Sequence, residues 1–211
     1  IWTNSLNKRT DELEKRSKKM SKSFVDWYNE ESIEIWDQYP DAHPYLPKLL
    51  GSNFDINAPI CYVGMNPSFN AKEIGAMMSR PEFDEFTPET LHEHSLNDRA
   101  RRINLIKLLE NIAVEEYLRY YGPIRDFNKS LDLDFTNLSF FDLFIMRQTD
   151  QMDVQALMKK KSNEKFKKLQ LNLFLSSLER INTKYICILN AGASNYLCDH
   201  LNIKKIVSSF K

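Results

Sequence analysis

Glycine, cysteine and net charge are all scarce in this 211-residue sequence. Only five glycines are present, fewer than the usual share of about 7%, so the position of each one is informative. The three cysteines, Cys61, Cys187 and Cys198, show no C-x-x-C spacing and leave one residue over in any pairing. This pattern argues against a disulfide framework and against a four-thiolate zinc or iron–sulfur site, and it fits a reducing compartment.

Charge of one sign and long apolar runs are missing as well. Lys+Arg 29 balance Asp+Glu 29, so an electrostatic partner has to be sought in local charge. No apolar stretch approaches the ~18 residues of a membrane span, and residues 1–22 are too charged for a secretory signal. The composition, with 42% hydrophobic and 27% charged residues, is that of a globular protein. We therefore expect a cytoplasmic protein without a membrane partner.

Several common catalytic signatures are also absent from the sequence. It contains no G-x-G-x-x-G, G-x-x-x-x-G-K-[ST], H-E-x-x-H or G-x-S-x-G, which disfavours the common nucleotide-phosphate-binding enzymes. His92 and His94 alternate, but no third metal ligand stands at a suitable spacing. We expect both histidines in a solvent-exposed loop, and the sequence predicts neither a metal nor a cofactor.

Residues 1–50 are predicted to form an N-terminal helical extension. Apolar side chains recur there at seven-residue spacing, as in an amphipathic helix: Leu6, Leu13, Met20 and Trp27. Residues 8–22 carry seven Lys/Arg and three Asp/Glu, whereas residues 24–41 carry six acids and no base. This split charge fits two solvated helix faces packed on the body, or a basic arm that contacts phosphates.

Residues 51–211 alternate between strand-like and helix-like segments and are expected to form one domain. Residues 60–63 are a short apolar run typical of a buried parallel strand. Further strand-like runs follow at residues 131–138, at 185–189 as a third buried strand, and at 204–207, and residues 139–144 are expected to form a loop or short helix. The alternation predicts an α/β fold, a three-layer αβα arrangement with a central four-stranded parallel sheet.

Two basic clusters stand out within this domain. Arg99, Arg101 and Arg102 crowd the start of a predicted helix, where positive charge opposes the helix dipole. They therefore either point at acidic side chains or bind an anion. The second cluster is a lysine-rich run with Glu164 as its only acid: Lys159, Lys160, Lys161, Lys165, Lys167 and Lys168.

The segment that follows the first strand carries the most specific pattern in the sequence. Residues 63–68 read Val-Gly-Met-Asn-Pro-Ser, and a loop at the carboxyl end of a strand is where open α/β sheets bind ligands. Strand, Gly-x-Asn-Pro and a small residue resemble the first motif of the uracil-DNA glycosylase superfamily, especially its mismatch-specific thymine/uracil branch. Residues 135–138 (Phe-Thr-Asn-Leu) and residues 173–194 resemble later motifs in the same order. The resemblance spans about residues 58–200.

The resemblance implies base excision in DNA repair: hydrolysis of the N-glycosidic bond of a flipped uracil or mismatched base. Asn66 would position the attacking water. Backbone N–H groups of Gly64 and Met65 would bond the base oxygens, and Pro67 and Ser68 would press on the neighbouring phosphate.

Other parts of the site are implied by the same resemblance. Asn137 would read the Watson–Crick edge of the base, and Phe69 would stack on the base. Phe83 and Phe86 are alternative candidates for this stacking role. Both basic clusters would contact DNA phosphates without sequence preference.

The sequence also departs from this family. Ser68 stands where mismatch-specific members have glycine, and the last motif, usually His-Pro-Ser or Asn-Pro-Ser, is not found; Ser208-Ser209-Phe210 stands near its expected place. Two alternatives therefore remain beside the glycosylase. One is a catalytically inactive relative that binds nucleic acid or nucleotides, and the other is a protein-interaction domain.

Overall fold

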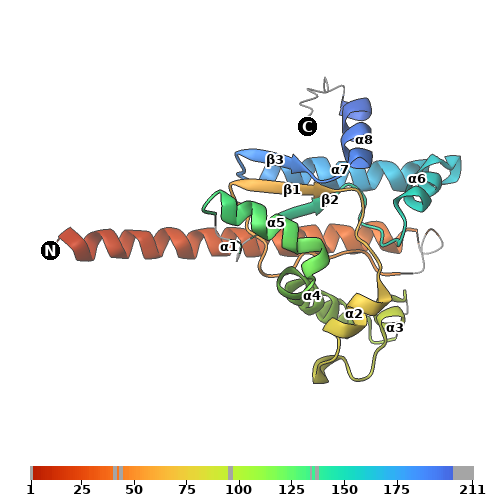
Figure 1. Ribbon diagram of the computed structural model, residues 1–211, viewed down its shortest axis with the longest axis horizontal. Coiled ribbons are helices and arrows are strands. Elements are labelled where there is room, and N and C mark those ends of the chain that lie inside the picture. Colours follow the sequence, from red (N-terminus) through yellow and green to blue (C-terminus); the bar gives the residue numbers. More distant parts are fainter. Residues whose placement is uncertain are drawn as a thin grey trace.

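The computed structural model describes residues 2–39, 42, 45–94, 97–133, 135 and 138–201. Within them, strands β1 (Ile60–Gly64), β2 (Ser139–Asp142) and β3 (Tyr185–Ile188) form a parallel sheet in the order β2-β1-β3 (Figure 1). The mixed α/β class and the parallel sheet are thus confirmed. The α-helices are α1 (Trp2–Asp37), α2 (Ala71–Met77), α3 (Pro88–His92), α4 (Arg99–Glu116), α5 (Leu118–Ser130), α6 (Gln151–Lys159), α7 (Glu164–Arg180) and α8 (Ala191–Leu201), and two 3-10 turns are η1 (Pro81–Phe83) and η2 (Lys161–Asn163).

The first strand lies where the sequence predicts it, but the second does not. The described residues of the run 131–138 belong to none of the three strands: Leu131 caps the end of α5, and Asp132 takes a left-handed backbone with φ 53°. The strand is instead β2, within residues 139–144, where a loop or short helix was expected. All four residues of β2 are buried, so they show no alternation of apolar and polar side chains that would identify a strand.

The third strand is confirmed at β3, but the prediction that it is buried is wrong. Tyr185 is 66% exposed, Ile186 51% and Ile188 37%. β3 pairs with β1 along one side only among the described residues. The fourth strand, predicted at residues 204–207, lies outside the described residues.

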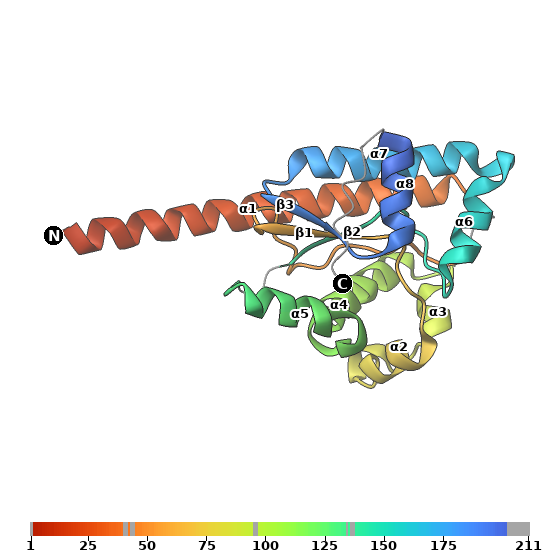
Figure 2. The same cartoon turned by 45° about the horizontal axis from the view of Figure 1, so that its top comes forward.

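Helices cover both faces of β2, whose neighbouring phenylalanines point in opposite directions. Phe141 contacts the rings of Phe24 and Tyr28 in α1, with centroids 6.0 and 5.6 Å away. Phe140 contacts Tyr120 and Tyr121 in α5, with centroids 5.7 and 5.9 Å away. Figure 2 shows the same arrangement, with α1 and α7 on one side of the strands and α4 and α5 on the other.

Helix α1 has two halves with different surroundings. Figures 1 and 2 show its first half extending beyond the sheet, while its second half runs along the body. Phe24, Val25, Tyr28, Ile35 and Trp36 from the second half are buried in the same core as the sheet. The second half of α1 is therefore packed on the body of the protein, as one of the two alternatives expected. The division of the chain at residue 50 stays a prediction.

None of the described helices combines the length and the apolar character that crossing a bilayer requires.

Candidate functional site

The motif loop leaves β1 side by side with the segment that leaves β2. Leu143 N donates to Gly64 O at 3.1 Å, and Phe144 N donates to Met65 O at 3.0 Å. Further on, Gln148 N donates to Pro67 O at 3.1 Å. These backbone bonds hold both loops together at the carboxyl edge of the sheet, the edge at which open α/β sheets bind ligands.

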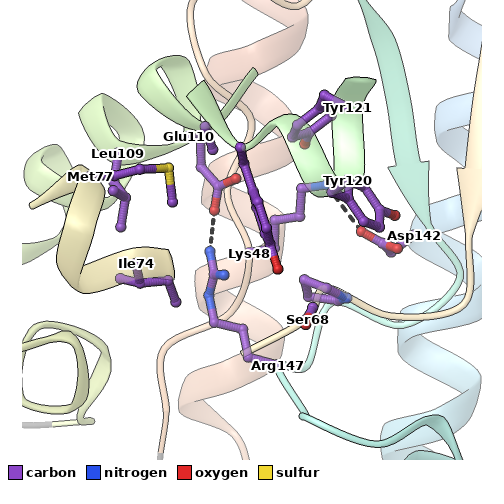
Figure 3. A pocket seen from close by; sticks show the side chains of 13 residues that line it. Lys48, Ser68, Ile74, Met77, Leu109, Glu110, Tyr120, Tyr121, Asp142 and Arg147 are labelled. Atoms are coloured by element: carbon purple, nitrogen blue, oxygen red, sulfur yellow. Dashed lines mark hydrogen bonds and ion pairs between the residues drawn. The ribbon is translucent and has the colours of Figure 1, made fainter. Parts of the chain in front are cut away.

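A pocket opens beside this edge and is lined by charged and aromatic side chains. Figure 3 shows Lys48, Glu110, Tyr120, Asp142 and Arg147 converging from segments that are far apart in the sequence. The pocket encloses about 480 Å³ when its open mouth is included, and about 50 Å³ of that space fits the centres of water molecules. The smaller figure corresponds to about four waters.

Lys48 and Asp142 form a buried ion pair in this pocket. Lys48 Nζ lies 3.0 Å from Asp142 Oδ2, and the two side chains are 11% and 2% exposed. Burial raises the pKa of Asp142, and the ammonium of Lys48 opposes that rise. Burial lowers the pKa of Lys48, but the charge of Asp142, together with smaller contributions from Tyr121 and Glu110, outweighs the effect of burial, so that the pKa of Lys48 is raised overall. The lysine is therefore a cation, and its charge favours the ionised form of the carboxyl group against the effect of burial.

Asp142 sits in a space that only glycine leaves open. Gly64 is its register partner on β1, and a Cβ on Gly64 would collide with Asp142 Oδ1 and lie 3.2 Å from the Tyr120 hydroxyl. Among the described residues, no group hydrogen-bonds to the buried Oδ1. The site thus contains one carboxylate oxygen without a protein partner.

A second buried ion pair joins Glu110 of α4 to Arg147, which follows β2. Glu110 is 9% exposed and Arg147 5%. Together with Lys48 and Asp142, the pocket holds two cations and two carboxylates, so its formal charge is zero. Such a pocket suits a neutral ligand better than a phosphate.

Asn66, the predicted catalytic residue, is 8% exposed and is not among the residues that line this pocket. Its amide nitrogen donates to Pro67 O at 3.1 Å and to Gln148 O at 3.3 Å. Two carbonyl acceptors fix the orientation of the amide, because the reverse orientation would face oxygen to oxygen. Its Oδ1 is buried and has no hydrogen-bond partner among the described residues.

The other residues predicted from the motif loop are separated by the structure. Pro67 and Ser68 line the pocket, whereas Met65 lines another pocket beside α6 and α8, which encloses about 1000 Å³ when its open mouth is included. Phe69, expected to stack on a base, is 8% exposed and stacks on Tyr45 with ring centroids 4.6 Å apart.

Two further candidates for stacking lie apart from the pocket. Phe83 is buried in the core, and Phe86 lies beneath the guanidinium groups of Arg101 and Arg102.

Asn137, the predicted base reader, lies outside the described residues. The second strand of the sheet, β2, begins at Ser139 and ends at Asp142. Asp142 is therefore the side chain that the end of β2 brings next to the motif loop.

The arginines at the start of α4 are occupied by protein groups. Arg99 donates to Asp37 at 2.5 Å, and Arg101 pairs with Glu85. Arg102 donates to backbone carbonyl groups. The expectation that these arginines point at acidic side chains is therefore confirmed for Arg99 and Arg101.

His92 is fully buried, so the expectation of two solvent-exposed histidines is wrong for it. Its ring lies edge-on to Phe69, with centroids 5.7 Å apart, and neither ring nitrogen has a partner among the described residues. Burial, and then the charge of Arg147, lowers the pKa of His92 well below its usual value. His94 is partly buried and lies 3.4 Å from Asp37. The described part of the chain contains no group of three or more metal-ligating side chains.

Five residues of the pocket were not expected from the sequence: Lys48, Glu110, Tyr120, Asp142 and Arg147. Lys48 lies in the segment between α1 and β1, and Glu110 interrupts the apolar face of α4. Asp142, which directly follows Phe140 and Phe141, offered the clearest signal: an acid at the end of an apolar run. Comparisons of the chain with protein-family models, with curated proteins and with solved structures find no match.

Proposed function

We propose that the protein hydrolyses the N-glycosidic bond of uracil, or of a mismatched base, flipped out of DNA. The observation that carries this proposal is the position of the Gly-Met-Asn-Pro-Ser loop, beside a pocket lined by Lys48 and Asp142 at the carboxyl edge of the sheet. A flipped base needs a pocket that holds a neutral ring and hydrogen-bonds its edge. The zero formal charge and the tyrosines of this pocket support such a ligand.

In the proposed reaction, the oxygen of a water molecule bonds to C1′ of the sugar. The C1′–N bond breaks, its electron pair goes to the base, and the base takes up the proton of the water. Asn66 orients the water through Oδ1, since its amide nitrogen is held by two carbonyl groups. An amide cannot accept the proton as a carboxylate does, so the reaction depends on a good leaving group.

The proposal extends to the fold and to the DNA contacts. A four-stranded sheet in a three-layer αβα arrangement stays part of the proposal, and the exposed side chains of Tyr185 and Ile186 leave room for further packing on β3. Asn137 contacts the base. The exposed lysines of α6, η2 and α7 contact the phosphates through counterion release.

The test uses oligonucleotides that contain uracil, hypoxanthine or a mismatched thymine, single-stranded and double-stranded. Base release leaves alkali-labile sites, which the proposal expects for at least uracil. Asn66→Ala should remove most of this activity, whereas Asn182→Ala, at an exposed asparagine outside the pocket lining, should not. A folded protein that releases none of these bases would contradict the proposal.

A second candidate is a relative that binds nucleic acid or nucleotides without catalysis. The burial of Asn66 favours this candidate, because Asn66 is not among the residues that line the pocket in which a base would lie. This candidate predicts DNA binding that weakens with salt, and no base release.

A further inference from the structure

Asp142 presents one oxygen to Lys48, and its other oxygen has no partner among the described residues. Lys48 Nζ donates to Oδ2 at 3.0 Å, while Oδ1 is buried and accepts no hydrogen bond from a described residue. A buried acceptor without a donor costs about 1–3 kcal/mol. Asp142 lines the pocket, so a ligand that brings a donor to Oδ1 recovers this cost.

Lys48 supplies the complementary group beside that oxygen. An ammonium has three N–H donors, and the hydrogen bond to Asp142 uses one of them. The ammonium also lies 3.9 Å from the centre of the Phe140 ring, which fixes its place in the pocket. The ion pair therefore offers an acceptor and a donor side by side, and its overall charge is zero.

We propose that Lys48 and Asp142 together bind a cyclic imide or lactam, a ring that presents an N–H next to a C=O. The N–H donates to Asp142 Oδ1, and the carbonyl accepts from Lys48. Uracil, thymine and hypoxanthine have such an edge. The inference rests on the proposed function for the origin of the ring in DNA, but the recognition itself requires no cleavage.

The pocket has to widen for this ligand. The space for water-sized molecules, about 50 Å³, is smaller than a pyrimidine ring requires. Tyr117 and Tyr120 line the pocket and are partly exposed, so their rings can turn outward. Tyr120 also lies close to Gly64 and thus close to Oδ1. Movement of this ring opens the acceptor to the ligand.

Replacing Asp142 by asparagine is expected to replace the hydrogen-bond acceptor at the position of Oδ1 by hydrogen-bond donors. The new amide turns its oxygen toward the Lys48 ammonium, because an NH₂ group facing an ammonium would be repelled. Its nitrogen then occupies the position of Oδ1 and presents donors in place of an acceptor. Asp142→Asn should therefore lose the preference for a ligand N–H without a change in side-chain size.

The experiment compares 1-methyluracil, which keeps the N3–H, with 1,3-dimethyluracil, which has no N–H. Ligand-observed NMR and chemical-shift titration measure their binding to the wild-type protein and to Asp142→Asn. The wild type should prefer 1-methyluracil by about tenfold or more, since the dimethyl compound leaves the acceptor unpaired. Asp142→Asn should bind the two equally or prefer the dimethyl compound. Asp126→Asn, the same change at an exposed position of α5, should keep the wild-type preference.

Equal binding of both compounds by the wild type, or binding of neither, would overturn the inference even if Asp142→Asn does not fold. Base release is measured separately on DNA. Binding of 1-methyluracil without base release keeps the inference and removes the proposed function. Base release together with equal binding of the two compounds keeps the proposed function and removes the inference.

Discussion

Lys48 and Asp142 are 94 positions apart in the sequence, yet their side chains form a buried ion pair at 3.0 Å. Lys48 lies before β1 and Asp142 ends β2, so the pair depends on the correct docking of both segments on the sheet. Its loss should affect folding as well as ligand binding.

Lys48→Met should lower the free energy of unfolding by about 3–5 kcal/mol at neutral pH, because Asp142 would remain as a buried carboxylate without a partner. The loss should shrink in acid. Burial already raises the pKa of Asp142, and removal of the ammonium raises it further. An acid with a raised folded-state pKa is least costly when protonated, so its cost appears as the pH rises through that pKa. Urea denaturation at several pH values measures this dependence.

Lys107→Met provides the matched control. Lys107 lies 3.9 Å from Asp26, and both side chains are partly exposed. Such a pair contributes about 0–1 kcal/mol, so the change should have little effect at any pH. Equal losses in the two variants would contradict the role assigned to burial.

Gly64→Ala should destabilise the protein by about 1–3 kcal/mol and abolish ligand binding in the pocket. The added methyl would collide with Asp142 Oδ1 and lie 3.2 Å from the Tyr120 hydroxyl, so Asp142 has to leave its place beside Lys48. Gly122→Ala is the control. A Cβ at Gly122 meets nothing within 4 Å, and alanine is favoured over glycine in a helix by roughly 0.5–1 kcal/mol. Thermal unfolding should move in opposite directions for the two variants.

His92→Leu should reduce the acid sensitivity of the protein. Burial lowers the pKa of His92 well below 6.5, so the folded state holds the neutral ring while the unfolded state takes up a proton. Protonation of His92 therefore costs the folded state nothing above about pH 6.5, and the free energy of unfolding decreases as the pH falls toward the folded-state pKa. As the pH falls below about 6.5, the free energy of unfolding of the wild type should therefore decrease more steeply than that of His92→Leu. His94→Gln should keep the wild-type dependence in the same unfolding experiments.

Arg147→Leu should cost about 3–5 kcal/mol, because it leaves Glu110 charged and buried without its partner. The double variant Glu110→Leu and Arg147→Leu should recover most of this loss, since apolar side chains can replace a buried ion pair. A double-mutant cycle of unfolding free energies measures the coupling. Additive losses would contradict the direct pairing of the two side chains.

The sequence predicts some strands well and others poorly, for a physical reason. β1 is a continuous apolar run that ends at a glycine, and both its burial and its end follow from that pattern. Residues 131–135 alternate apolar and acidic side chains as a half-buried strand does, but Leu131 caps the end of α5 and Asp132 takes a left-handed backbone. β2 is buried on both faces, so two adjacent phenylalanines were mistaken for a loop or short helix.

The site was predicted only in its motif loop. Pro67 and Ser68 reach the pocket because they directly follow β1. Lys48, Glu110 and Arg147 come from three separate segments, and only tertiary docking brings them together. A lysine in a loop or a glutamate in a helix has the same local pattern whether it is solvated or buried. Their pairing therefore could not be read from spacing along the chain.

The two halves of α1 are one continuous helix, and this has a mechanical consequence. Residues 2–37 contain neither glycine nor proline, so the helix has no residue at which it would bend easily. A label attached to the extending half is therefore connected by a continuous, unbent helix to Phe24, Tyr28 and Trp36 in the core. It should tumble with the body of the protein, and a load applied at the amino end is transmitted directly to the packing against Phe141.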